Sequence, residues 1–184
     1  GVGGGAGALE AIVSVFGFVR ETNYGRLFDV RTTPQANNLA YTDLGLAPHT
    51  DNPYREPPPS LQLLHCIETA DAGGETILVD GFAAAQKLRA QDAAAYAVLS
   101  STPVRFSWRD ADNAFEAWAP VLELDERKEV KALRINDRAL APLDLAPATA
   151  STWRDAYRKL IAIVNDPAAH VRFALESGDV LIFD

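Results

Sequence analysis

Residues 61–81 read LQLLHCIETADAGGETILVDG, and this stretch decides the fold class. Its two runs at 61–67 and 76–79 are rich in Leu, Ile and Val and are short enough to be strands. Between them, Gly73 and Gly74 supply a turn that needs the permissive backbone of glycine. The pattern predicts two strands that lie next to each other in one sheet.

The rest of the chain mixes short strands with helices. Residues 82–99 are rich in alanine and predict one or two helices, with Asp80 and Gly81 shaping the junction into them. Residues 151–164 carry apolar side chains at spacings of three and four, which predicts another helix. The remaining predicted elements are a helix at 8–16 and strands at 27–30, 104–108, 121–124, 130–135, 171–174 and 180–183, with a charged hairpin turn at 125–129. Many short strands with inserted helices predict a mainly β fold, a barrel or jelly roll.

The composition favours one soluble domain. The 184 residues are 48% hydrophobic and 23% charged, which is enough to bury one core, so we predict a single domain over residues 1–184. No apolar run reaches the roughly 20 residues that span a membrane. A net charge of −8 argues against nucleic acid or an anionic membrane as a partner, because both would repel the chain. The only cysteine, Cys66, excludes an internal disulfide, so a cytoplasmic location is the simplest prediction.

His49, Thr50 and Asp51 form the motif that carries chemistry. Fe(II) sites of the 2-His-1-carboxylate type bind imidazole nitrogen and carboxylate oxygen on one face of the ion. On an extended strand, residues two apart point to the same side, so both donors would face one cavity. Taken alone, a His-x-Asp tripeptide is more often a solvated surface turn, and only its surroundings favour the metal site.

Those surroundings extend over most of the chain. They are FVRETNYG at 18–25, NNLAYT at 37–42, NPYREPPP at 52–59, the stretch at 61–81 and, more weakly, RIN at 134–136 and GDVLIFD at 178–184. Together they resemble the γ-butyrobetaine hydroxylase and trimethyllysine dioxygenase branch of the TauD-like Fe(II)/2-oxoglutarate-dependent oxygenases. The resemblance implies a double-stranded β-helix, which is a jelly roll with inserted helices.

The same resemblance implies Fe(II) as the cofactor, with 2-oxoglutarate and O2 as co-substrates. His49 and Asp51 match two of the metal ligands, and Thr76 matches a hydroxyl that helps to bind the carboxylate of 2-oxoglutarate. In the family, the third ligand and the arginine that grips 2-oxoglutarate follow the strand that ends here at Asp184. We therefore expect this chain to be incomplete at its C-terminus. The resemblance also implies a missing N-terminal portion, because the zinc-bearing N-terminal region of some relatives has no counterpart here.

The two other histidines match no ligand position of the family. His65 lies in an apolar strand pattern, where we expect a buried or strand-face side chain with a satisfied hydrogen bond. His170 follows a turn at 165–167, and we expect it to face solvent.

Aromatic residues indicate the class of substrate. Tyr24, Phe28 and Tyr41 match the positions from which the butyrobetaine enzymes build an aromatic cage around a trimethylammonium group. Such a cation cannot donate hydrogen bonds, so the faces of aromatic rings must stabilise it. By the same resemblance, Asn38 orients the carboxylate of the substrate and Asn136 assists. The alternative is that the aromatic residues belong to the sheet core, and for Phe28 both interpretations are equally favoured.

The leading prediction is an Fe(II)/2-oxoglutarate-dependent hydroxylase of a small molecule, γ-butyrobetaine or a related trimethylammonium compound, as in carnitine biosynthesis. A second prediction is hydroxylation of trimethyllysine or a trimethylaminoalkyl-phosphonate, because the cage does not distinguish what is attached to the far end of the cation. A third is a non-catalytic jelly roll that binds a quaternary ammonium ligand. Members of this family often form homodimers, although the sequence itself shows no interface.

Overall fold

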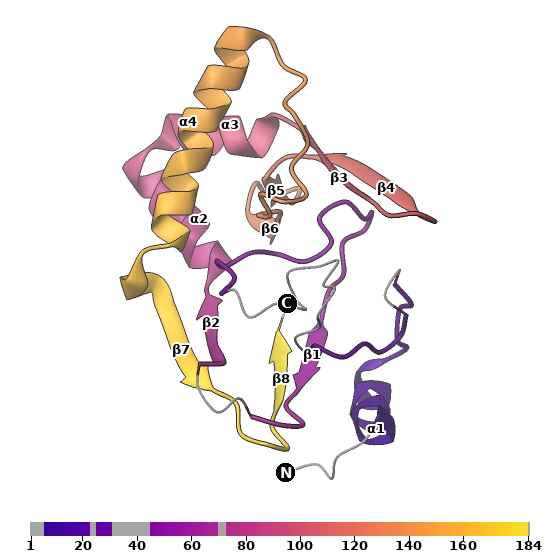
Figure 1. Cartoon of the computed structure of the whole chain (residues 1–184). Helices are drawn as coiled ribbons and strands as arrows, with labels where there is room; N and C mark the ends of the chain where they lie inside the picture. Colours follow the sequence, from indigo (N-terminus) through magenta and orange to yellow (C-terminus); the bar gives the residue numbers. More distant parts are fainter. Residues whose placement is uncertain (1–5, 23–24, 31–44, 70–72, 184) are drawn as a thin grey trace. The chain divides into compact units, whose positions relative to one another are not determined.

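The computed structural model describes residues 6–22, 25–30, 45–69 and 73–183 (Figure 1). The chain divides into two compact units. The first unit comprises Gly1–Leu46, Ser60–Thr76 and Phe173–Asp184, and the second unit comprises Ala47–Pro59 and Ile77–Arg172. Both units are therefore assembled from segments that are distant in sequence.

The first unit contains a helix and a pair of strands. Helix α1 (Ala6–Phe16) confirms the helix predicted at 8–16. Strand β1 (Gln62–His65) runs antiparallel to β8 (Val180–Phe183), so both of these predicted strands are confirmed. Residues 27–30 form no strand, so that prediction is wrong. The side chains of this run are too exposed to form the buried face of a sheet, since Phe28 is 52% exposed.

The predicted pairing of the two runs within residues 61–81 is also wrong. Strand β2 (Glu75–Val79) pairs with β7 (His170–Ala174), while β1 pairs with β8. Tight hairpins have loops of about two to five residues, whereas residues 66–74 separate the two runs, and each run pairs with a strand distant in sequence. Gly73 and Gly74 have φ angles of +75° and +74°, which confirms the predicted need for glycine.

Two antiparallel hairpins lie in the second unit. Strands β5 (Leu122–Leu124) and β6 (Val130–Leu133) form the hairpin predicted around the charged turn. Strand β3 (Val104–Arg109) pairs with β4 (Ala114–Ala119), and the carboxylate of Asp110 accepts two backbone N–H groups in the turn between them. Strand β4 is missing from the predicted strands because its sequence, AFEAWA, is half alanine, a weak strand former.

Helices complete the second unit. The predicted helical region at 82–99 is divided into α2 (Gly81–Gln91) and α3 (Ala93–Ser101), and the helix predicted at 151–164 is α4 (Pro147–Val164). A short 3₁₀ helix, η2 (Pro167–Ala169), follows α4. Proline is favourable in the first turn of α4. Backbone N–H groups in that turn have no partner within the helix, so the missing N–H of proline costs no hydrogen bond.

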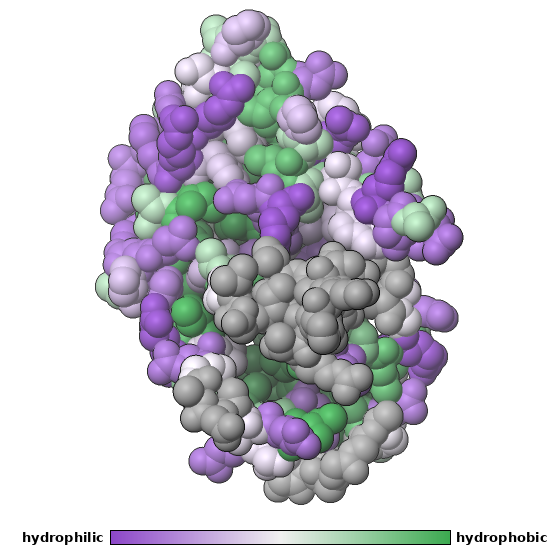
Figure 2. All heavy atoms as spheres, in the orientation of Figure 1, coloured by the Kyte–Doolittle hydropathy of each residue, from purple (hydrophilic) through white to green (hydrophobic). Residues whose placement is uncertain are grey.

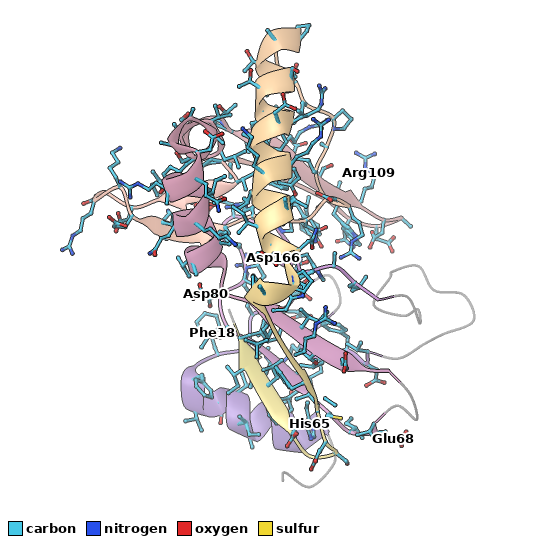
Figure 3. The ribbon with its side chains drawn as sticks, turned by 90° about the vertical axis from the view of Figure 1, so that its left-hand side faces the viewer. Phe18, His65, Glu68, Asp80, Arg109 and Asp166 are labelled. Atoms are coloured by element: carbon cyan, nitrogen blue, oxygen red, sulfur yellow. The ribbon has the colours of Figure 1, made fainter. Side chains whose placement is uncertain are left out.

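Aspartate side chains begin three of these helices. Asp80 accepts the N–H of Ala83 at 2.9 Å and caps α2, which confirms the predicted junction. Asp92 caps α3 in the same way. Asp166 caps η2, and its second oxygen accepts a hydrogen bond from Lys87 of α2 at 3.3 Å. Figure 3 labels Asp80 at the start of α2 and Asp166 just after α4.

The core of the second unit lies along α4, which packs against α2 and α3. Within α4, Trp153 stacks on Tyr157 with ring centroids 4.9 Å apart. The other fully buried apolar side chains of this core include Leu88, Leu99, Val104, Phe106, Val121, Leu122 and Leu160. Burying one such side chain contributes roughly 1.5–3 kcal/mol. Figure 2 shows many hydrophilic residues on the visible face, with hydrophobic residues between them. None of the helices in the described ranges is long and apolar enough to cross a membrane.

Candidate metal site

The side chains of His49 and Asp51 face each other in the second unit. His49 Nε2 lies 3.2 Å from Asp51 Oδ1, and His49 Nδ1 lies 2.9 Å from the carbonyl oxygen of Ala47. A carbonyl oxygen only accepts hydrogen bonds, so Nδ1 carries the proton that makes this contact. In the neutral imidazole, the lone pair of Nε2 is then directed at a carboxylate oxygen. Two acceptors in this arrangement require a cation between them, either a proton or a metal ion.

The electrostatics of the pair agree with this requirement. The hydrogen bond that protonated His49 donates to Asp51 raises the pKa of His49 above its ordinary value, while partial burial of the ring acts in the opposite direction. The side chains of His49 and Asp51 are 23% and 43% exposed, so an ion can reach both from solvent. His49 Nε2 and Asp51 Oδ1, which attract a proton between them, can also act as two ligand atoms for a divalent cation.

The separation of the two donors fits a metal ion as well. Neighbouring ligands about 2.1 Å from an octahedral ion lie about 3 Å apart, close to the 3.2 Å between His49 Nε2 and Asp51 Oδ1. The backbone carbonyl on Nδ1 is the partner that commonly orients a metal-binding histidine. These two residues therefore fit two positions of an iron site of the 2-His-1-carboxylate type.

The residue between the two donors is held by residues 135 and 136. The N–H of Thr50 donates to the carbonyl oxygen of Ile135 at 2.7 Å, and the N–H of Ile135 donates to Thr50 Oγ1 at 2.9 Å. The side-chain amide of Asn136 donates to the carbonyl oxygen of Thr50 at 3.1 Å. Residues 49–51 are not in a strand, so the strand predicted to direct His49 and Asp51 is absent and these three hydrogen bonds fix the segment instead.

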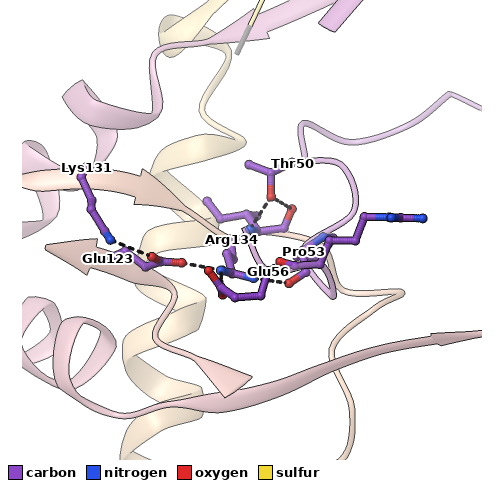
Figure 4. A network of polar contacts seen from close by, with 8 residues as sticks. Thr50, Pro53, Glu56, Glu123, Lys131 and Arg134 are labelled. Atoms are coloured by element: carbon purple, nitrogen blue, oxygen red, sulfur yellow. Dashed lines mark hydrogen bonds and ion pairs between the residues drawn. The ribbon is translucent and has the colours of Figure 1, made fainter. Parts of the chain in front are cut away.

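Arg134 connects the same region to the segment that follows Asp51 (Figure 4). Its Nη1 donates to the carbonyl oxygens of Pro53 and Arg55, and its Nη2 donates to Glu56 at 2.7 Å. On the other side of the guanidinium group, Nε donates to Glu123 of β5 at 2.6 Å. The side chain of Arg134 is only 1% exposed, so its guanidinium group is shielded from water.

Aromatic packing holds the segment after Asp51 from another direction. Tyr54 is 5% exposed and stacks on Trp108 and Phe115, with ring centroids 5.8 and 6.1 Å away. The hydroxyl of Tyr54 donates to Asn52 Oδ1 at 2.6 Å. Asn52 has a φ of +48°, a conformation that asparagine adopts more readily than most residues. The turn directly after Asp51 is therefore fixed by packing and by a side-chain hydrogen bond.

The structure brings only some of the predicted site residues together. Asn136 is 8% exposed and contacts the backbone between His49 and Asp51. Phe28 belongs to the first unit, and its ring is half-exposed. Thr76 lies in β2 and is also part of the first unit. The predicted substrate residues Tyr24, Asn38 and Tyr41 lie outside the described residues.

The two other histidines differ from their predictions. His65 in β1 has an Nε2 that is buried and makes no hydrogen bond among the described residues, so the expected partner is absent there (Figure 3). His170 is partly buried rather than solvent-facing, because its Nε2 contacts the carbonyl oxygen of Val164 at 2.9 Å. Within the described ranges, no group of three His, Cys, Asp or Glu side chains is arranged to hold a metal ion.

Arg134 is the residue whose importance the motifs do not predict. Its position in the sequence gives a signal, since it is a charged residue between Leu133 and Ile135 in an apolar strand pattern. A buried arginine needs an acidic partner, and Glu123 lies across the same predicted hairpin. That combination is sufficient to predict an internal ion pair, but it does not predict the contacts with residues 53–56.

Comparison with known proteins extends these observations. The sequence matches, over residues 1–184, the family described as "Taurine catabolism dioxygenase TauD, TfdA family". The γ-butyrobetaine dioxygenase of Pseudomonas sp. (strain AK-1) is 39% identical over 178 residues, which cover 97% of this chain and 46% of that protein. The human γ-butyrobetaine dioxygenase is 31% identical, with 97% of this chain and 47% of that protein covered. The chain thus spans about half the length of these relatives.

Solved structures show that the fold is shared. The PvcB protein from Pseudomonas aeruginosa superposes with a TM-score of 0.65 at 22% identity, covering 100% of this chain and 64% of that protein. A taurine dioxygenase-like protein from Burkholderia xenovorans, described as putative and α-ketoglutarate-dependent, gives a TM-score of 0.59 at 21% identity, covering 74% and 48% of the two chains. Both similarities concern the arrangement of helices and strands.

Proposed function

Because this chain belongs to the TauD/TfdA family of dioxygenases, we propose that it forms part of an Fe(II)- and 2-oxoglutarate-dependent hydroxylase. The proposed substrate is γ-butyrobetaine or a related trimethylammonium compound. Two relatives that cover nearly the whole chain are γ-butyrobetaine dioxygenases, and the mouse trimethyllysine dioxygenase is 29% identical. The proposed architecture is the double-stranded β-helix with inserted helices.

One observation carries the proposal. His49 Nε2 and Asp51 Oδ1 lie 3.2 Å apart as two facing acceptors, and Nδ1 of the same histidine is already engaged by a backbone carbonyl. Two facing acceptors are stabilised by a cation that both contact, and their separation suits neighbouring ligands of one ion.

Each proposed site residue would have its own role in the reaction. Bound Fe(II), together with 2-oxoglutarate and O2, supplies the oxidising chemistry. His49 and Asp51 hold the ion, and Thr76 binds the carboxylate of 2-oxoglutarate. Asn136 keeps the segment between the two ligands in place and offers its remaining amide hydrogen to the substrate. The protein's own contribution is to bind, to orient one C–H bond and to exclude water.

The choice of substrate class rests on charge and on aromatic side chains. A quaternary ammonium group has no hydrogen to donate, so ring faces and a negative environment are what stabilise it in a protein. Tyr24, Phe28 and Tyr41 are the proposed ring donors, and Asn38 is proposed to orient the far end of the substrate. The net charge of −8 favours a cationic ligand over an anionic one.

The test is succinate formation by the natural full-length product of the gene, with Fe(II), 2-oxoglutarate and γ-butyrobetaine. His49→Ala removes one ligand and is expected to lower turnover by at least 10³-fold, an effect about as large as losing a catalytic group. His170→Ala is the matched control, because it removes a partly buried imidazole outside the candidate site. Substantial turnover by His49→Ala would contradict the assignment of the iron site.

A panel of substrates separates the alternatives. γ-Butyrobetaine, trimethyllysine and a trimethylaminoalkyl-phosphonate are compared by kcat/KM, and the proposal expects γ-butyrobetaine to give the highest value. Turnover of trimethyllysine but not of γ-butyrobetaine would instead support trimethyllysine hydroxylation as the activity. Binding of these cations without succinate formation, and without dependence on Fe(II), would instead support a non-catalytic binding protein.

A further inference from the structure

We propose that Arg134 and Thr50 are positioning residues of the metal site. Together they fix residues 49–56, the segment that carries both candidate ligands, to residues 134–136. Neither side chain is expected to touch the ion or the substrate. The inference deepens the proposed function and rests on it, because it assigns a role to residues around the same pair of ligands.

The contacts of Arg134 are unusual in what they bind. Two of its partners are backbone carbonyl oxygens, those of Pro53 and Arg55, and both belong to the segment directly after Asp51. A carbonyl group cannot change its rotamer, so a hydrogen bond to it restrains the main chain itself. The planar fork of a guanidinium group reaches several acceptors at fixed angles at once, whereas an ammonium group does not.

The charges around Arg134 explain why it can be buried. Glu123 has a side chain that is 14% exposed and contacts both Arg134 and Lys131, the latter at 3.5 Å. Glu56 supplies a second carboxylate, and its side chain is 67% exposed. The four side chains carry two positive and two negative charges, so the cluster is neutral. A buried arginine with balanced charge and satisfied donors is stable in one orientation.

Thr50 restrains the same segment from its other end. Its hydroxyl accepts the N–H of Ile135, its own N–H donates to the carbonyl oxygen of Ile135, and its carbonyl oxygen accepts from Asn136. Residues 134–136 are consecutive, so one short run of residues holds the position between the two ligands and the turn beyond them, through the backbone of Ile135 and the side chains of Arg134 and Asn136. We expect movement of this run to shift Thr50 and, with it, the two candidate ligands on either side.

Two pairs of variants test the proposal in the full-length protein. Arg134→Lys keeps the positive charge but loses the fork that reaches the carbonyl groups, and Glu123→Gln changes the opposite end of the same ion pair without touching residues 53–56. Thr50→Val removes the hydroxyl with little change of shape, and Thr50→Ser restores it. The measurement is binding of Co(II) alone, followed by its visible absorption in the absence of substrate.

The expected results separate positioning from general stability. Arg134→Lys should weaken binding of Co(II) by about 10–100-fold, the usual effect of losing a residue that orients metal ligands, and should alter the absorption spectrum. Glu123→Gln should change the affinity for Co(II) by less than about threefold, even though its loss of thermal stability should be similar to that of Arg134→Lys. Thr50→Val should weaken binding by about tenfold, and Thr50→Ser should restore it.

Each other outcome overturns a defined part of the argument. If Arg134→Lys and Thr50→Val bind Co(II) as the wild type does, the positioning role is wrong while the metal site stands. If Arg134→Lys and Glu123→Gln weaken Co(II) binding equally, the charged cluster around Arg134 affects binding only by changing the stability of the fold. Should Arg134→Lys fail to fold, the two Thr50 variants decide the matter. If wild-type binding does not depend on His49, the metal site and the proposed function both fail.

Discussion

The two units bury their apolar side chains to different extents. In the second unit, Trp153 and Leu88 are each 1% exposed, and Leu160 is fully buried. In the first unit, Phe18 is 92% exposed and Phe28 is 52% exposed. Among the described side chains, every apolar residue in the buried class belongs to the second unit.

This difference bears on where a site can be held rigidly. His49 and Asp51 lie in the second unit, which contains the closed core and the buried side chain of Arg134. Ligand geometry needs supporting side chains whose own rotamers are fixed by packing. The described part of the first unit lacks buried side chains of this kind, so it supports a precise arrangement less well on its own.

The largest effect on the free energy of unfolding is expected from creating a cavity in the core of the second unit. Trp153→Ala should lower the free energy of unfolding by about 3–5 kcal/mol, because it removes a large buried aromatic side chain and leaves a cavity. Urea denaturation followed by circular dichroism measures this change. Trp118→Ala is the matched control, since Trp118 is 51% exposed and its loss should cost about 1 kcal/mol or less. Equal losses for the two variants would contradict the contrast between buried and exposed tryptophans.

A smaller effect is expected at Tyr157, whose hydroxyl donates to Asp137 at 2.6 Å. Tyr157→Phe should cost about 1–2 kcal/mol, since a hydrogen bond to a charged acceptor is lost. Burial of the ring, and then its hydrogen bond to Asp137, raise the pKa of Tyr157 in the folded protein. The neutral form is thus favoured by folding, and this stabilisation is present below about pH 10, the ordinary value for tyrosine.

The dependence on pH gives Tyr157 a specific signature. As the pH rises above about 10, unfolded chains lose the tyrosine proton while the folded protein retains it, so the stabilisation declines. The difference in unfolding free energy between the wild type and Tyr157→Phe should therefore shrink between pH 9 and pH 11. A difference that stays constant over this range would show that Tyr157 ionises equally in both states.

The smallest effect is expected in the first unit. Phe18→Ser should change the free energy of unfolding by no more than about 0.5 kcal/mol, because the side chain is 92% exposed. Thermal melting of the same protein preparation measures the change. A loss as large as that of Trp153→Ala would show that Phe18 is buried in solution, and the contrast between the units would then be wrong at this position.

Local signals in the sequence were sufficient for most helices and strands. The apolar face of α4 is visible as spacings of three and four, and the junction at Asp80 into α2 was predicted as well. The pairing of β1 with β8 was not predictable in the same way. Their partners are set by residues more than a hundred positions away, and propensity gives no information about such contacts.

The candidate site shows the same limit. The His-x-Asp motif identifies two donors because their chemistry is encoded in residue type. Their support is not encoded locally, since Thr50 binds Ile135 and Arg134 binds residues 53–56 only after the chain has folded. The proximity of His49 and Asp51 was predictable, while the network that holds them required the structure.

The hydrogen bonds between Thr50 and Ile135 have a consequence for biosynthesis. They join residues 85 positions apart, so His49 and Asp51 leave the ribosome well before the backbone that supports them. At about 5–20 residues per second, the interval is roughly 4–17 s. During this time the two candidate ligands belong to a nascent segment without its scaffold. Under the proposed function, we expect the ion to bind only after residues 134–136 have folded against residues 49–56.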